Sequence, residues 1–160
     1  MNRINRLAIA IAASITLVTP LSAQGTSAPV LLTGDVKAEK IVIDADGKER
    51  IELAEPTAII PGDRLVFGTD YASTGSEPVN NFVVTNPLPA AVRLAPDADP
   101  ALIVSVDGGK AFGALTALTV TSPDGTMRPA AHADVTHVRW VLASIAPGTS
   151  GRLTYPAIIR

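Results

Sequence analysis

The stretch VDGGKA brings two glycines and a lysine together, a combination found in loops that bind phosphate. A P-loop requires G-x-x-x-x-G-K-[ST] between a strand and a helix. Here Gly108, Gly109 and Lys110 lack the first glycine, and Ala111 stands where Ser or Thr would bind magnesium. Asp-Gly-Gly between two strand-like segments is instead typical of a β-hairpin. The sequence predicts that Asp107, Gly108 and Gly109 form a turn and that Lys110 is not a phosphate ligand.

Carboxylates supply the first candidate metal ligands. Asp44 and Asp46 in DADGK resemble the start of a calcium loop, but the bidentate Glu that closes such a loop is missing. Glu49 and Glu52 stand nearby, yet a solvated hairpin turn is the favoured interpretation. One alternative stays open, a looser calcium site gathered from loop aspartates: Asp97, Asp99 and Asp124.

The sequence gives little support for a metal site built on histidines or for a catalytic nucleophile. His132 and His137 lie five residues apart, so in a strand they point to opposite faces, and no further ligands stand nearby. The chain has no cysteine, which excludes thiol catalysis and thiolate metal sites. No G-x-S-x-G or Ser-x-x-Lys motif occurs either. We therefore expect no enzyme activity, no cofactor and no metal site, although a catalytic triad assembled from loops remains formally open.

The elements that would position these groups begin after an N-terminal segment of a different character. Residues 1–25 start with Arg3 and Arg6, continue with the uncharged run LAIAIAASITLV, and end in small residues. This pattern predicts a cleavable signal peptide, with cleavage after Ala23 or Gly25. The apolar run is too short to cross roughly 30 Å of hydrocarbon. We expect a periplasmic or secreted protein with no membrane span after cleavage.

The remaining chain carries eleven Lys and Arg against fifteen Asp and Glu, because both arginines of residues 1–25 leave with the signal peptide. A net charge near −4 without any basic run argues against binding of nucleic acid. About 135 residues form one domain with a sizeable core. We expect a linker over residues 26–35 and one domain over residues 36–160.

Short alternating segments dominate that domain. KIVIDADGKERIEL predicts a hairpin in which Ile41 and Ile43 alternate with Val42 and Asp44, and Ile51 and Leu53 alternate with Glu52. Eight or nine such strands, with turn signals about every ten residues, predict an antiparallel sandwich or barrel. SPDGTMRPAAHAD is the longest loop-like stretch. Thirteen prolines and twelve glycines leave little room for a helix.

The segment VTHVRWVL has the clearest alternation. Thr136, Val138, Trp140 and Leu142 share one face, and Val135, His137, Arg139 and Val141 share the other. The first set is the more apolar and contains the only tryptophan. We expect it to face the core, with the two outward valines partly covered by a loop or a partner.

These motifs together resemble the conserved repeat domain of bacterial exported and surface proteins known as domain of unknown function 11. The resemblance covers about 100 residues, from Pro61 onward. It is carried by Pro61, Gly62, Asp63, Tyr71, Gly75, Asn86, Pro87, Leu88, Pro89, Asp107, Gly108, Gly109, Trp140, Pro147 and Gly148. One departure is Ser73-Thr74-Gly75, where the family usually has an asparagine.

The resemblance implies an immunoglobulin-like antiparallel β-sandwich whose motif residues mark turns and strand edges, with no catalytic residues to transfer. We therefore expect an exported, non-enzymatic module with a structural or protein-interaction role. A protein partner would bind through loops or an edge strand. The alternative is a periplasmic protein that binds a small ligand or calcium through acidic loops.

Overall fold

The computed structural model describes residues 29–160, and the predicted signal peptide lies outside them. This part of the chain is all-β, with no α-helix. Its strands are β1 (Val30–Ile43), β2 (Glu49–Ala54), β3 (Arg64–Ser73), β4 (Val79–Pro87), β5 (Val92–Leu94), β6 (Ile103–Ser105), β7 (Gly113–Ala114), β8 (Thr119–Thr121), β9 (Met127–Pro129), β10 (His137–Ile145) and β11 (Ser150–Ile159). Two 3-10 helices, η1 (Leu115–Ala117) and η2 (His132–Asp134), interrupt them.

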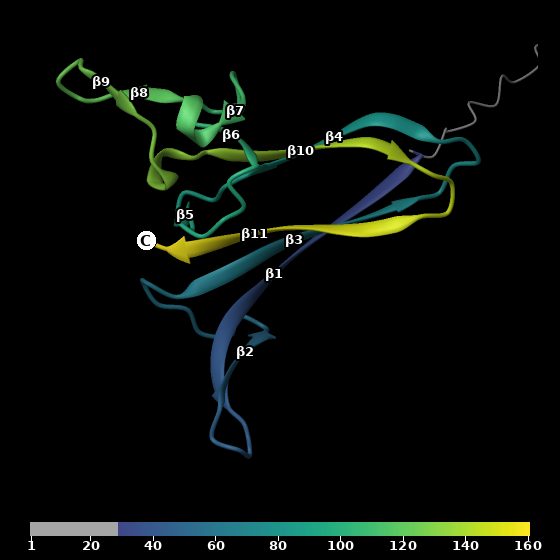
Figure 1. Cartoon of the computed structure of the whole chain (residues 1–160), viewed down its shortest axis with the longest axis horizontal. Coiled ribbons are helices and arrows are strands. Elements are labelled where there is room, and N and C mark those ends of the chain that lie inside the picture. The colour runs from purple at the N-terminus through teal and green to yellow at the C-terminus, as the bar shows by residue number, and fades with distance from the viewer. Residues whose placement is uncertain (1–28) are drawn as a thin grey trace, which may run out of the picture.

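Two antiparallel sheets form the predicted sandwich. The larger sheet has the strand order β2-β1-β3-β11-β5, and the smaller has β4-β10-β6-β7. Figure 1 shows them as two layers, with the β1–β2 hairpin extending below and the β8–β9 ribbon at the upper left.

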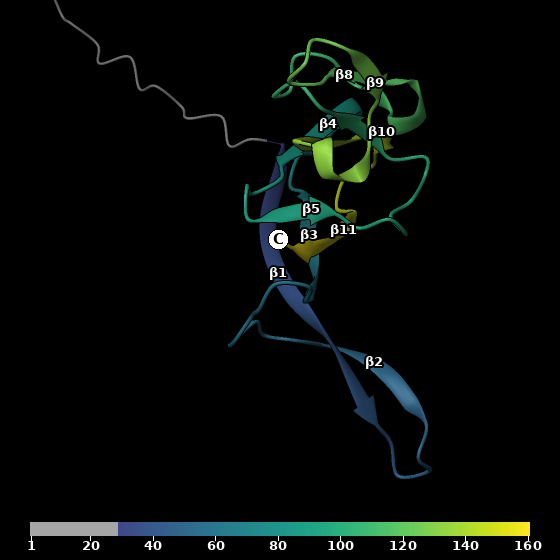
Figure 2. The same cartoon turned by 90° about the vertical axis from the view of Figure 1, so that its left-hand side faces the viewer.

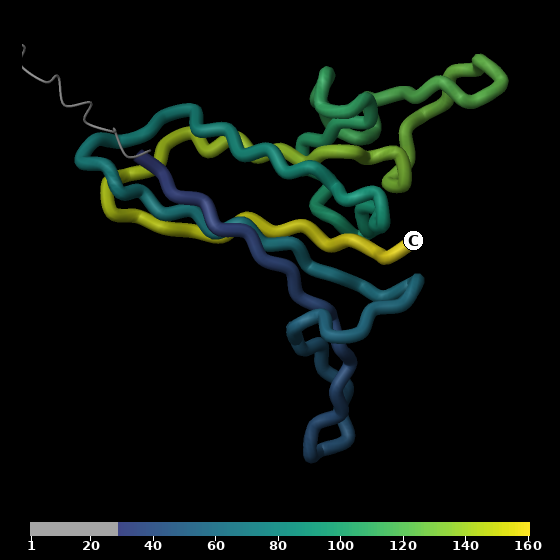
Figure 3. Tube along the Cα trace, turned by 180° about the vertical axis from the view of Figure 1, so that it is seen from behind, coloured from purple at the N-terminus to yellow at the C-terminus, as the bar shows by residue number. Residues whose placement is uncertain are grey.

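The chain passes repeatedly from one sheet to the other. The β3–β4 and β10–β11 connections lie at the same end of the sandwich, at the left of Figure 3. At this end the backbone N–H of Ser73 donates to the carbonyl of Thr149 (2.8 Å). Gly148 turns the β10–β11 connection with a φ of +70°, a conformation that suits glycine.

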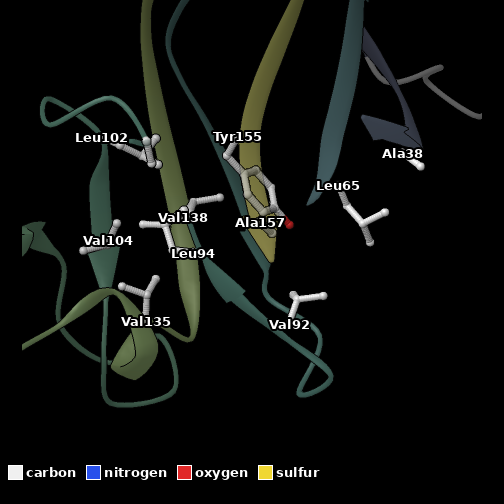
Figure 4. Packing of buried hydrophobic residues seen from close by; sticks show 11 residues of the cluster. Ala38, Leu65, Val92, Leu94, Leu102, Val104, Val135, Val138, Tyr155 and Ala157 are labelled. Atoms are coloured by element: carbon white, nitrogen blue, oxygen red, sulfur yellow. The ribbon is translucent and has the colours of Figure 1, made fainter. Parts of the chain in front are cut away.

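The core lies between the sheets and includes side chains from both. Figure 4 shows Tyr155 and Ala157 of β11 between Val138 of β10 and Leu65 of β3, with Val104 of β6 beyond Val138. Tyr155 is 2% exposed and stacks on Phe67 with ring centroids 5.0 Å apart. Because the chain has no disulfide, burial of apolar side chains in this core is the main source of stability.

Strand β10 has the predicted alternation. Val138 is fully buried, and Trp140 packs against the core with its ring 6.1 Å from that of Tyr155. Val141 points the other way and is 51% exposed. Val135 differs from the prediction: it is buried in the core, because it precedes the first residue of β10 and the alternation does not extend to it.

Two segment predictions need correction. The linker predicted for residues 26–35 is wrong from Val30 onward, because β1 begins there and pairs with β3 as far as Ala38. The stretch predicted as a long loop contains β9, which pairs with β8 in a ribbon turned by Gly125 (φ +85°). Three-residue strands are too short to give a clear alternation.

Candidate functional site

The β1–β2 hairpin is an arm that extends away from the sandwich, as Figure 2 shows. β1 changes partner along its length: Val30–Ala38 pairs with β3, and Ala38–Ile43 pairs with β2. At its tip, the Asp44 carboxylate accepts hydrogen bonds from the N–H groups of Asp46 and Lys48 (both 2.9 Å). Gly47 completes the turn with a φ of +79°. The predicted hairpin is confirmed, and it lies outside the main body of the fold.

One face of the arm is aliphatic and open to solvent. The register pairs Ile41 with Ile51, Glu39 with Leu53, and Ile43 with Glu49, so these residues share a face. Ile41, Ile43 and Ile51 are each close to 70% exposed, and Leu53 is 51% exposed. Neighbouring aliphatic side chains with this much exposure mark an interaction surface in a soluble protein.

Ion pairs fix the base of the arm. Arg64 of β3 donates through Nε to Glu39 (2.7 Å) and through its two terminal nitrogens to Asp97 (3.1 and 2.8 Å). The hydrogen bonds from Arg64 lower the pKa of the Asp97 carboxyl. Lys37 pairs with Glu55 just beyond the end of β2. The bidentate contact of Arg64 holds Asp97 in the loop after β5, while the Glu39 and Lys37 pairs tie the strands of the arm to β3 and to each other.

The Gly-Gly-Lys segment lies in the connection between β6 and β7, which form the predicted hairpin. Gly108 and Gly109 have φ values of +80° and +86°. The Asp107 carboxylate accepts the N–H groups of Ala111 and Lys110 (3.0 Å each), and these bonds, with Ala111 foremost, lower its pKa. Asp107 thus binds the loop amides that a phosphate would need, as expected for a structural turn.

The loop also folds over the outward face of β10. The Arg139 guanidinium lies 3.3 Å from the centroid of the Phe112 ring, and His137 meets the same ring edge to face. Gly109 approaches the His137 ring so closely that a β-carbon there would lie 3.4 Å from it. His137 and Arg139 point away from the core as predicted, but this loop shields them from full exposure.

Most of the aspartates weighed for calcium have a local role. Asp44 closes the arm's turn, Asp97 binds Arg64, and Asp99 accepts the N–H of Ala101 (2.9 Å). Asp124 accepts both the hydroxyl and the N–H of Thr126, which lower its pKa. Among residues 29–160, no group of three or more acidic, histidine or cysteine side chains is arranged to hold a metal ion.

The two histidines lie in different surroundings. His132, in η2, lines a pocket of about 220 Å³ together with Leu94, Leu102 and Asp99. His137 lies at the start of β10, with Nδ1 3.1 Å from the Thr136 hydroxyl. They do not form a shared site.

The motif residues occupy turns and strand ends. Asp63 accepts the N–H of Ile60 (2.9 Å), and Gly62 donates to the carbonyl of Ile159, which joins the turn before β3 to the end of β11. The Asn86 amide donates to the Thr69 hydroxyl across the two sheets (2.6 Å). Tyr71 lies over Gly151, its partner on β11. Gly75 follows β3, Pro89 accepts the N–H of Val92 in the turn before β5, and Pro147 precedes Gly148.

A cleft of about 490 Å³ opens between the sheets on the side of β1 and β4. Its walls are mainly apolar and include Leu32, Val36, Phe67, Thr69, Asn86 and Tyr155. Burial raises the pKa of the Tyr155 hydroxyl to about 12. No residue between 29 and 160 forms a hydrogen bond with this hydroxyl. Sequence reasoning missed the cleft, since it depends on the spacing between two sheet edges.

Comparison with protein-family models, with curated proteins and with solved structures finds no match to this chain. The resemblance to domain of unknown function 11 therefore stays a prediction from its motifs. A search of residues 29–160 for a helix long and apolar enough to span a membrane finds none.

Proposed function

We propose that this chain is an exported, non-enzymatic β-sandwich that acts by binding a protein through its β1–β2 arm. The observation that carries the proposal is the exposed aliphatic face formed by Ile41, Ile43, Ile51 and Leu53. Burying such side chains is favourable, and a partner is the means by which a projecting ribbon buries them. The ion pairs at the base hold this face in one orientation.

The charged and potentially reactive side chains support a binding role over catalysis. Asp107 holds its own loop, Arg139 lies on Phe112, and Arg152 is paired with both Asp35 and Asp70. A catalytic constellation brings a nucleophile and a base within hydrogen-bond reach of each other and of a cleft. The Thr136 hydroxyl lies 3.1 Å from His137 Nδ1, but it donates to the carbonyl of Ser105 and accepts the N–H of Gly108, so it serves the structure of the loop.

Site-directed photo-cross-linking in the native envelope tests the proposal. A photoreactive residue at Ile41 should give one discrete adduct with a protein. The matched control is Val141, which is 51% exposed on the outward face of β10. Equal cross-linking from both positions, or none from Ile41, would contradict a role for the arm.

Export is a separate part of the proposal, supported by the pattern of residues 1–25. Protein purified from the envelope or the medium should have the intact mass of a chain cleaved between Ala23 and Thr26. A full-length species confined to the cytoplasm would refute it.

A second candidate function is binding of a small apolar ligand in the cleft beside Tyr155. The observation that favours it is a tyrosine, 2% exposed, whose hydroxyl has no partner among residues 29–160 and which forms part of the wall of an apolar cleft. Pockets that bind small ligands have this composition of apolar walls and few polar groups. Trp140 lies beside Tyr155, so a shift of its fluorescence on addition of the apolar probe 1-octanol, absent in Tyr155→Phe, would support this candidate.

A further inference from the structure

Strand β2 has a free edge. It is the terminal strand of the larger sheet, hydrogen-bonded on one side to β1 alone. A two-stranded ribbon is marginally stable in water, and three or more strands with an apolar face are much more stable. The arm is such a ribbon, so an added strand would stabilise it.

The side chains of β2 alternate in a way that suits pairing with a second copy of the same strand. Ile51 and Leu53 lie on the aliphatic face, while Arg50 and Glu52 lie on the opposite face. Both charged side chains are more than half exposed. Two opposite charges at positions i and i+2 become complementary when the strand meets a copy of itself in the antiparallel direction.

We propose that two copies of this chain pair through β2 in antiparallel fashion, with Ile51 of each copy at the two-fold axis. This rests on the proposed function, because it names the partner of the same arm. In this register Arg50 lies opposite Glu52 of the second copy, and the symmetric pair repeats the contact. Opposite charges directly across two strands are favourable, and like charges are unfavourable.

Other registers of the two paired β2 strands are less favourable. A shift of one residue would set the aliphatic face of one copy against the charged face of the other. A shift of two residues would place Arg50 opposite itself, or Glu52 opposite itself. Only the register centred on Ile51 joins the two aliphatic faces and matches these charges.

The same register extends the aliphatic row. Ile41 is the partner of Ile51 within one copy. Pairing at Ile51 therefore lines up four isoleucines across four strands, two from each copy. The edge of β4 is less suitable, because Asn81 has a φ of +53°, which distorts this edge strand where another strand would have to pair with it.

Charge reversal with mixing tests the pairing. The wild-type mature protein should be a dimer by sedimentation equilibrium. Arg50→Glu and Glu52→Arg should each be monomeric, since each places like charges across the axis. An equimolar mixture of the two should form a heterodimer, because the introduced glutamate of one variant and the introduced arginine of the other then face each other across the axis. Lys40→Glu, on the same face but on the inner strand β1, should stay dimeric. Circular dichroism must show that every variant is folded.

Introduced cysteines test the register, since the chain has none of its own. Ile51→Cys should form an intermolecular disulfide, because directly opposite residues have β-carbons about 4.5–5.5 Å apart. Leu53→Cys should not, because the two copies of residue 53 lie four residues out of register. Cross-linking at residue 53 but not at residue 51 would refute the register.

The outcomes separate the two proposals. A wild-type protein that is monomeric at millimolar concentration, or a mixture that forms no heterodimer, overturns the self-pairing. If the Ile41 photo-cross-link still captures a different protein in that case, the proposed function stands. If neither self-pairing nor a cross-link is found, both proposals fail.

Discussion

Replacing Asp134 by asparagine should weaken the fold in a pH-dependent way. Its carboxylate receives two hydrogen bonds from the Arg128 guanidinium (both 2.7 Å) and one from the N–H of Ala131 (2.8 Å). The Asp134 side chain is only 19% exposed. These bonds join β9 to η2 and so fix the β8–β9 ribbon to the sandwich.

The magnitude follows from the pKa of Asp134. The hydrogen bonds from Arg128, more than any other cause, lower this pKa from 3.8 to about 2. At 1.36 kcal/mol per pKa unit, the ionised pair stabilises the fold by about 2 kcal/mol at most. Solvent screens the pair, because Arg128 is 46% exposed, so we expect about 1 kcal/mol. Since the pKa is lower in the folded state, this contribution is present above pH 4 and is lost as the pH falls toward 2.

Urea unfolding followed by Trp140 fluorescence measures the effect. At pH 7, Asp134→Asn should lower the free energy of unfolding by about 1 kcal/mol relative to wild type, and this difference should shrink as the pH falls through about 2, the pKa of Asp134 in the folded state. Glu77→Gln is the control, since no ion pair or hydrogen bond of the Glu77 side chain occurs within residues 29–160. A difference that does not change with pH would refute the reasoning.

Three further predictions concern single side chains. Trp140→Ala should lower the free energy of unfolding by about 2–4 kcal/mol, since the ring is only partly buried. Folded wild-type protein should also have blue-shifted tryptophan emission relative to the urea-unfolded chain. Tyr155→Phe should change the free energy of unfolding by less than about 1 kcal/mol, because its hydroxyl loses no protein hydrogen bond; a larger loss would reveal a bound partner for that hydroxyl. Lys110→Ala should leave stability within about 0.5 kcal/mol, and nucleotide-dependent stabilisation of the wild type in a thermal melt, lost in this variant, would disprove the turn assignment.

The sandwich was predictable because its strands obey local rules. The alternation in VTHVRWVL placed Val138 and Trp140 toward the core, and Asp-Gly pairs placed the turns at Gly47 and Gly108. These signals depend on neighbouring residues alone. Val135 was misplaced because a period-two pattern does not show where a strand begins.

The arm was only half predictable. Ile41, Ile43, Ile51 and Leu53 showed a ribbon with one apolar face, but the same pattern describes a strand packed on a core. Whether that face is covered depends on the point where β1 changes partner from β3 to β2, near Ala38. That point is set by contacts between residues distant in sequence, and the cleft beside Tyr155 depends on such contacts in the same way.

The length of β1 has a mechanical consequence. Nine of its residues, from Val30 to Ala38, pair with β3, and six, from Ala38 to Ile43, pair with β2. A pull along this strand loads the hydrogen bonds of the β1–β3 ladder side by side, in shear, so many of them must break together. A sideways pull on the arm would instead open the β1–β3 ladder from its Ala38 end, one bond at a time. The molecule should therefore resist tension along β1 and yield readily when its arm is pulled aside.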